Sequence, residues 1–233
     1  MAFNFGISAE SAVKTTRRPL APWNIYDVKF IGCEIVEGDS KNDPSVHWKR
    51  LDIKFENEDG YFNASLWWPK DGDDVRKEVD GANGGKITFP SNFEVLMAMI
   101  SQTGQVLNPS GFEKMQKASA KFTNFDQVAK ALIQITNEVK GKETKIKLIG
   151  KKTKENKIIA DVPRIVGINK QGESYISDNY IGDKLFFSDY QEGERNKYLN
   201  TKPTNMPKEE NAVIDNAGVD AAPADDFDLG ALL

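Results

Sequence analysis

The chain has 233 residues, a formal net charge of −4, one cysteine and one histidine. This length can bury a core without a disulfide or metal staple, and Cys33 with His47 can form neither an intramolecular disulfide nor a Cys/His zinc site. The first eleven residues lack the basic start and long apolar run of a signal peptide, and no stretch approaches the roughly 20 apolar residues that cross a bilayer. We therefore expect a soluble protein of the cytoplasm, without membrane contact, cofactor or metal.

The charge is distributed unevenly along the sequence. Residues 209–233 carry seven acids and no lysine or arginine, so the first 208 residues have a net charge of +3. Residues 140–170 hold ten lysines and arginines against three acids, an excess that can attract a polyanion. A solvated charged face is the alternative interpretation of the same excess.

The first predicted strands follow Pro22. Val28 and Phe30 alternate with polar residues, and the apolar parity shifts across Gly32, which predicts a β-bulge that helps a small sheet to curve. Leu51, Ile53 and Phe55 alternate with polar residues up to a turn at 57–60, after which the even positions from 62 to 68 are apolar. These two runs predict a β-hairpin.

Two helices are predicted after a glycine-rich linker at 81–85. Ser91 and Glu94 form a capping-box pattern before an apolar stripe that ends near Gly104. A second helix is predicted from a cap at Asn124 to a stop at Gly141.

Two further strands are predicted after the second helix. The first covers residues 144–148, with its lysines on one face, and the second covers residues 157–168, interrupted by Pro163. The segment from 171 to 200 contains several aromatic residues and could add a hairpin or loops packed on the domain.

The order strand, strand, strand, helix, strand, strand is that of an oligonucleotide/oligosaccharide-binding (OB) fold, a five-stranded barrel whose helix lies between the third and fourth strands. The fold class is therefore mainly β with α: an OB barrel with one extra helix. Residues 1–200 form the expected OB domain with a basic N-terminal arm at Arg17 and Arg18. Residues 201–233, rich in proline, asparagine and acids, form an expected disordered acidic tail with an apolar tip.

The second and third strands carry aromatic and basic residues on the face opposite the apolar one. Single strands of nucleic acid are bound by aromatic side chains that stack on bases and by cations that follow the phosphates, and these strands form the binding face of an OB barrel. The candidate contacts are Trp48, Arg50, Lys54, Tyr61 and Trp67. Trp67 and Trp68 are neighbours and must point to opposite faces of a strand, so one of them is expected to lie outside the core.

Lysines on the fourth strand and the turn after it are the candidate phosphate contacts, because this turn flanks the binding face of an OB barrel. They are Lys145, Lys147, Lys151, Lys152 and Lys154. The alternative is a solvated edge strand on which lysines prevent aggregation.

The C-terminus ends in a run of acids followed by apolar residues. This run is Asp225, Asp226, Phe227, Asp228 and Leu229, closed by Leu232 and Leu233. With the predicted barrel, it resembles viral and bacterial single-stranded-DNA-binding proteins, phage replication proteins in particular. The resemblance implies that the tail recruits replication and repair partners, such as a polymerase, helicase or primase, and competes with DNA for the basic groove.

The sequence contains none of three common catalytic patterns. It contains no Walker-type loop, no Gly-x-Ser-x-Gly motif and no second histidine to pair with His47, so we expect a protein that is not an enzyme. The function expected is sequence-nonspecific binding of single-stranded DNA in replication, recombination and repair. A strand-annealing mediator and a protein-interaction adaptor remain alternatives, and a homo-oligomer remains open.

Overall fold

The computed structural model describes residues 17–41, 43–80, 84–164 and 166–201. The strands are β1 (Asn24–Asp39), β2 (His47–Glu56), β3 (Tyr61–Trp67), β4 (Lys77–Asp80), β5 (Lys86–Phe89), β6 (Glu143–Lys152), β7 (Ile158–Asp161), β8 (Val166–Ile168) and β9 (Ser174–Ile176). The helices are α1 (Asn92–Leu107), α2 (Pro109–Ala118), the short 3-10 helix η2 (Ser119–Lys121), α3 (Phe125–Asn137) and α4 (Asp189–Asn200). The protein is thus a mixed α and β structure.

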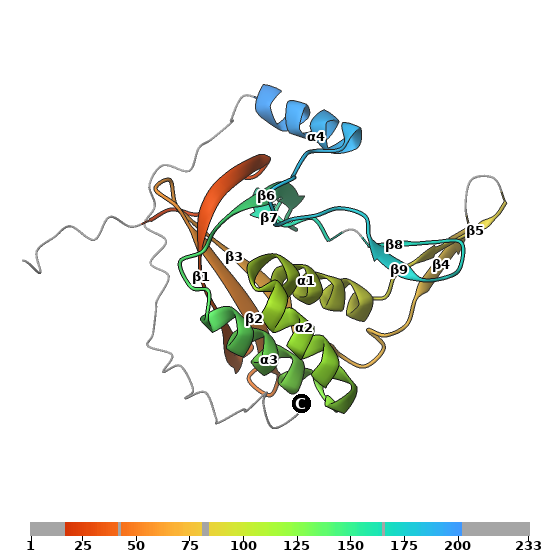
Figure 1. Ribbon diagram of the computed structural model, residues 1–233. Coiled ribbons are helices and arrows are strands. Elements are labelled where there is room, and N and C mark those ends of the chain that lie inside the picture. The colour runs from red at the N-terminus through yellow and green to blue at the C-terminus, as the bar shows by residue number, and fades with distance from the viewer. Residues whose placement is uncertain (1–16, 42, 81–83, 165, 202–233) are drawn as a thin grey trace, which may run out of the picture.

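A five-stranded antiparallel sheet in the order β3-β2-β1-β6-β7 forms the body (Figure 1). The register of β1 against β2 shifts between Phe30 and Gly32, which confirms the predicted bulge. Long, bent β1 can therefore pair with β6 through its first half and with β2 through its second. The predicted hairpin is β2–β3, and its apolar face is buried.

The sheet does not close into the barrel that the sequence predicted. Within the described ranges β3 and β7 are both edge strands, with no ladder between them. Strand β7 ends at Asp161, before Pro163, whose missing N–H cannot extend a ladder. A side chain spans the opening instead: Arg164 Nη2 donates to the carbonyl oxygen of Ser65 on β3 at 3.1 Å.

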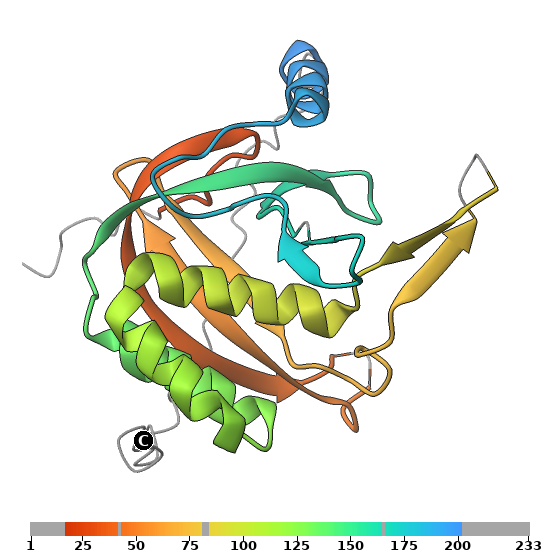
Figure 2. The ribbon, with the colours of Figure 1, turned by 45° about the vertical axis from the view of Figure 1, so that its right-hand side comes forward.

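Helices α1, α2 and α3 pack together against one side of the curved sheet (Figure 2). The two predicted helices are confirmed: Ser91 and Glu94 form the capping box of α1, and Asn124 caps α3. Helix α2 was missed, although Asn108 caps it and Pro109 occupies its first turn. Together the strands and helices bury one continuous hydrophobic core.

The sequence analysis missed the two strands that flank the glycine-rich linker at 81–85. Residues 81–83 lie outside the described ranges, but β4 and β5 on either side pair with each other as a two-stranded ribbon. This ribbon, which we call the β4–β5 arm, projects away from the body in both views (Figures 1 and 2).

The segment after β7 divides into two parts. Strands β8 and β9 form a small hairpin at the base of the arm, and α4 lies on the far side of β6 from helices α1–α3 (Figure 1). Ser188 and Gln191 form a capping box that begins α4. None of the helices that the structure describes has the length and apolar character needed to cross a membrane.

Candidate nucleic-acid interface

Trp48, Arg50 and Trp67 come together on the outer face of β2 and β3. The two indole rings lie 5.7 Å apart between centroids at 66°, and Trp67 is 50% exposed. The Arg50 guanidinium carbon lies 5.3 Å from the Trp48 ring centroid and 5.7 Å from that of Trp67. The cluster places one cation beside two aromatic rings. All three residues had been predicted to lie on this face of the sheet.

Buried Asp52 and the backbone of β1 fix the cluster in place. Arg50 Nε lies 2.9 Å from Oδ1 of Asp52, a buried carboxylate that also accepts a 2.6 Å hydrogen bond from Ser65 Oγ. The Trp48 ring lies over Gly38, where an added Cβ would come within 2.9 Å of it, and its Nε1 donates to the Asp39 carbonyl oxygen. A site held in this way loses little side-chain entropy when it binds a ligand.

Trp68 points to the opposite face, as its neighbour's exposure requires. Its ring meets the Phe125 ring edge-on at 4.8 Å and 89°, and it packs against the hydrophobic core. Lys49 Nζ lies 4.8 Å from the centroid of the Trp68 ring and pairs with Asp126. Trp68 therefore joins the sheet to α3.

The other predicted residues of this face, Lys54 and Tyr61, lie farther along it. Lys54 pairs with Glu34 on β1. Tyr61 is half-buried beside the N-terminal segment, where its N–H donates to the Arg18 carbonyl oxygen. In the register of β2 and β3, Lys54 is opposite Asn63 and Tyr61 is opposite Glu56. Neither residue is therefore a cross-strand partner of Trp48 or Trp67.

A hollow of about 230 Å³ adjoins Trp67 between the end of β3 and the start of α1. Among the residues that line it, Lys70 and Arg164 supply positive charge and Phe93 supplies an aromatic ring. Sequence reasoning missed these three. Arg164 and Phe93 lie within a predicted strand and a predicted helix, and Lys70 follows a predicted strand, so nothing local in the sequence marked them as neighbours of Trp67.

Lys147 is the main correction to the predicted site. It is only 1% exposed, and its Nζ pairs with Asp178 and donates to the Phe186 carbonyl oxygen at 2.8 Å. The segment from β9 to α4 covers this face of β6, so the predicted outward direction was right but the predicted exposure was wrong. Lys147 holds that segment and does not face solvent.

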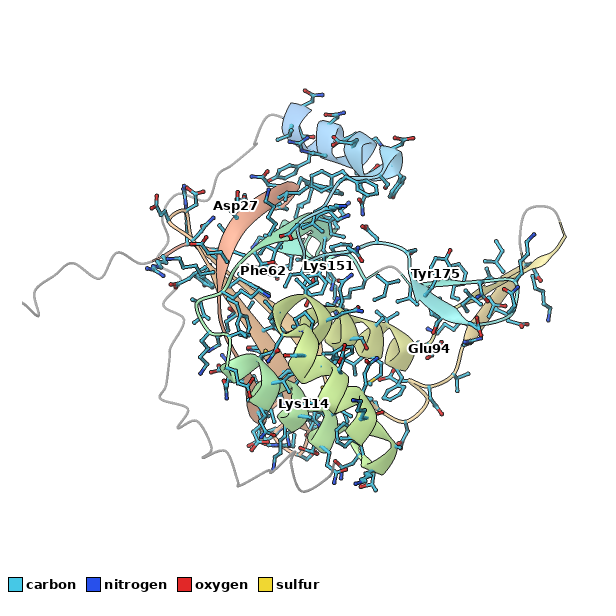
Figure 3. The ribbon with its side chains drawn as sticks, in the orientation of Figure 1. Asp27, Phe62, Glu94, Lys114, Lys151 and Tyr175 are labelled. Atoms are coloured by element: carbon cyan, nitrogen blue, oxygen red, sulfur yellow. The ribbon has the colours of Figure 1, made fainter. Side chains whose placement is uncertain are left out.

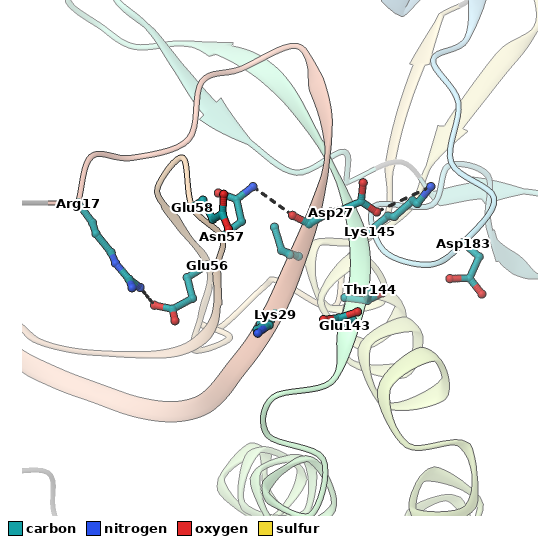
Figure 4. Close-up of a pocket in the computed structure, with 11 residues that line it drawn as sticks. Arg17, Asp27, Lys29, Glu56, Asn57, Glu58, Glu143, Thr144, Lys145 and Asp183 are labelled. Carbon is teal, nitrogen blue, oxygen red and sulfur yellow. Dashed lines mark hydrogen bonds and ion pairs between the residues drawn. The ribbon is translucent and has the colours of Figure 1, made fainter.

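Lys145 is exposed but lies among acids. It borders a hollow of about 540 Å³ that also receives Asp27, Glu143 and Asp183, and its Nζ is 3.8 Å from Asp27 Oδ1 (Figure 4). Arg17, on the other side of the same hollow, pairs with Glu56. Such surroundings disfavour a phosphate, which argues against the predicted role of Lys145.

The three remaining lysines are exposed on the β6–β7 hairpin (Figure 3 labels Lys151). Lys151 pairs with Asp161 at 3.0 Å, and Asp161 in turn lies 3.4 Å from Arg164. Since Arg164 reaches Ser65, this chain of side chains connects the hairpin to the end of β3 beside Trp67. Lys152 and Lys154 stay candidates on the same hairpin.

His47 lies next to Trp48 with two carboxylates. Its Nδ1 is 3.0 Å from Asp39 Oδ1 and its Nε2 is 3.8 Å from Glu37 Oε2. The hydrogen bond with Asp39 raises the pKa of His47 above its usual value, an effect that desolvation opposes and the charges of both acids support. In the described ranges no three His, Cys, Asp or Glu side chains gather as metal ligands would.

The predicted partner-binding residues, 225–229, 232 and 233, lie outside the described residues. No family model, curated protein or solved structure matches this chain. The geometry of the described residues is therefore the basis for assigning a function.

Proposed function

We propose that the protein binds single-stranded DNA without sequence preference, through the outer face of β2 and β3. The observation that carries the proposal is the cluster of half-buried Trp48 and Arg50 with exposed Trp67, held by buried Asp52. Exposed aromatic rings beside a cation are the arrangement on which bases stack while the backbone is neutralised.

The strand order supports the same proposal. The meander β1-β2-β3 is extended on its other side by β6, which pairs with β1, and by β7, which pairs with β6. The resulting order β3-β2-β1-β6-β7 is that of an OB barrel opened between its third and fifth strands. We propose that the domain is a partly open OB fold, with Arg164 bridging the opening. In that fold the second and third strands form the customary oligonucleotide surface, where the tryptophan cluster lies.

A path for the strand follows from the cations near the cluster. Arg164 and Lys70 border the hollow beside Trp67, and Lys151 connects to Arg164 through Asp161. We propose that the phosphates run from Arg50 past Arg164 toward the β6–β7 hairpin. Lys147 and Lys145 take no part, because one is buried and the other lies among acids.

Titration of intrinsic tryptophan fluorescence with oligothymidylate tests the proposal. Stacking on Trp48 and Trp67 should quench the emission, more strongly at low salt than at moderate salt. A matched oligouridylate compares RNA with DNA, and an acidic peptide of equal charge is the control for nonspecific electrostatic binding. Absence of quenching by both nucleic acids at low salt would contradict the proposed function.

The acidic tail is proposed to compete with DNA for this face. A tethered polyanion acts at an effective concentration in the millimolar range, so even a weak affinity makes it a competitor. Deletion of residues 209–233 should therefore tighten DNA binding, mostly at low salt. Deletion of residues 227–233 removes one acid, so DNA binding should hardly change while capture of a polymerase, helicase or primase is lost. Weaker DNA binding without the whole tail would contradict competition.

A further inference from the structure

The hollow between the end of β3 and the start of α1 is lined mainly by apolar and aromatic side chains. Leu66, Leu96 and Met99, which are buried, provide aliphatic surface. Trp67 and Phe93 provide two aromatic rings and are 50% and 37% exposed. The volume of about 230 Å³ lies below the roughly 300–1,000 Å³ of sites for drug-sized ligands, so the hollow suits one small ring system.

Asp73 joins the loop after β3 to the first turn of α1, the two segments between which the hollow lies. Its carboxylate accepts hydrogen bonds from Asn92 Nδ2 at 2.7 Å and from the Lys70 N–H at 2.8 Å. Its carbonyl oxygen accepts a further hydrogen bond from the Phe93 N–H at 2.9 Å. Because these bonds hold the hollow in shape, little further ordering is required when a ligand enters.

The charges around the hollow favour a ligand that carries an anionic group. Among the described residues that line it, Lys70 and Arg164 are positive and Asp73 is negative. Both carboxylate oxygens of Asp73 already accept hydrogen bonds from this protein. The lining therefore has an excess of one positive charge, which attracts an anion.

A nucleotide combines the features that this lining selects. Its base is a flat ring system that stacks on aromatic side chains whatever its identity, and its phosphate is an anion. The Asn92 amide lines the same hollow and can exchange hydrogen bonds with the polar edge of a base. Trp67 belongs both to the tryptophan cluster and to the lining, so the hollow continues the surface proposed for DNA.

We propose that the hollow receives one nucleobase of the bound single strand, which stacks on Phe93 while Lys70 and Arg164 contact the neighbouring phosphates. This inference rests on the proposed function, because the strand must first bind to the tryptophan cluster. It adds a nucleotide that turns from the outer face of the sheet at Trp67 toward the start of α1. Phe93 thereby becomes a third aromatic contact.

Titration of the full chain with oligothymidylate, followed by tryptophan fluorescence, tests the inference. Phe93→Ala should raise the dissociation constant about 5- to 150-fold, the effect of losing one stacked base. Phe93→Leu keeps an apolar side chain of similar reach but removes the ring, so it should raise the constant at least about threefold. Phe89→Ala removes a 47% exposed ring from the β4–β5 arm, outside the described lining of the hollow, and as the matched control should leave the constant unchanged.

Crosslinking locates the base directly. An oligothymidylate that carries 5-iodouracil, which couples to nearby aromatic rings on irradiation, should mark Phe93 of the wild type in addition to the tryptophans. Crosslinks confined to Trp48 and Trp67, or a Phe93→Leu variant that binds as tightly as the wild type, would overturn the inference while the proposed function stands. A wild type whose emission oligothymidylate does not quench at low salt would overturn both.

Discussion

The outer faces of β2–β3 and of β6 have the same alternating pattern in the sequence but different surroundings in the structure. On β2 and β3 the outward side chains Arg50 and Trp67 meet solvent and each other. On β6 the outward side chain of Lys147 meets Asp178, Gln191 and the Phe186 carbonyl oxygen. The alternation of side chains along a strand thus determines on which face of the sheet a residue lies. A segment far along the chain determines whether that face is open to solvent.

The largest expected effect is the loss of stability when the ion pair on the covered face of β6 is removed. Lys147→Ala leaves the largely buried Asp178 carboxylate without its cation, which should lower the free energy of unfolding by about 3 kcal/mol. Urea denaturation measures the loss. Lys145→Ala, at an exposed residue two positions away on β6, should change stability by less than about 0.5 kcal/mol. A stable Lys147→Ala variant with weakened DNA binding would show that Lys147 faces the ligand after all.

The Lys147 result also shows what the sequence could predict. Local signals were sufficient for the bulge at Gly32, the β2–β3 hairpin and the caps of α1 and α3, because each depends on neighbours within a few residues. Closure of the barrel could not be predicted, because it depends on whether β7 reaches β3. The same holds for Lys147, whose partner lies 31 positions away, and for Arg164, whose partner Ser65 lies 99 positions away.

The neighbouring residues Trp67 and Trp68 test the contrast between the open face of the sheet and its core face. Trp68→Ala should lower the free energy of unfolding by about 3 kcal/mol, since it removes the contact with Phe125 and the core. Trp67→Ala and Trp48→Ala should instead weaken DNA binding by about 1–3 kcal/mol each, the cost of one stacked base, with little change in stability. Denaturation and oligothymidylate titration of the three variants provide both measurements. The reverse pattern would place the binding surface on the helix side of the sheet.

Removal of a single cation should have a smaller effect than removal of a tryptophan. The effect should appear in the salt dependence of DNA binding. Arg164→Gln should reduce the magnitude of the slope of log K against log salt by about 0.7, the value for one phosphate contact on a single strand. Lys145→Ala, among acids, should leave the slope unchanged and is the matched control. Titrations at four or more salt concentrations provide the slopes. If Lys145→Ala reduced the slope and Arg164→Gln left it unchanged, the phosphate path would lie on the β1–β6 side of the sheet.

The smallest effect concerns His47, at the edge of the open face. Its hydrogen bond with Asp39 raises the pKa of His47 above the usual histidine value of 6.5, so the folded state favours the charged ring. A raised folded-state pKa adds stability that is fully present below the unfolded-state pKa and is lost as the pH rises through the folded-state pKa. The melting temperature of the wild type relative to His47→Gln should therefore fall slightly as the pH rises above about 6.5. The change should be small, because the histidine side chain is largely exposed and solvent screens its partners.

As the single histidine of the chain, His47 gives one unambiguous imidazole signal in an NMR titration. That titration should give a pKa above 6.5 in the wild type and a lower value in Asp39→Asn, which removes the charge but keeps a hydrogen-bonding group. Trp48 reports on the same event, because its Nε1 donates to the carbonyl oxygen of Asp39. If the ring titrates at or below 6.5 in the wild type, Asp39 is oriented away from it in solution, and the β1–β2 end of the binding face is less ordered than the rest. If instead the wild-type pKa is raised and tryptophan emission follows the same titration, this end is held as firmly as Arg50 is by Asp52.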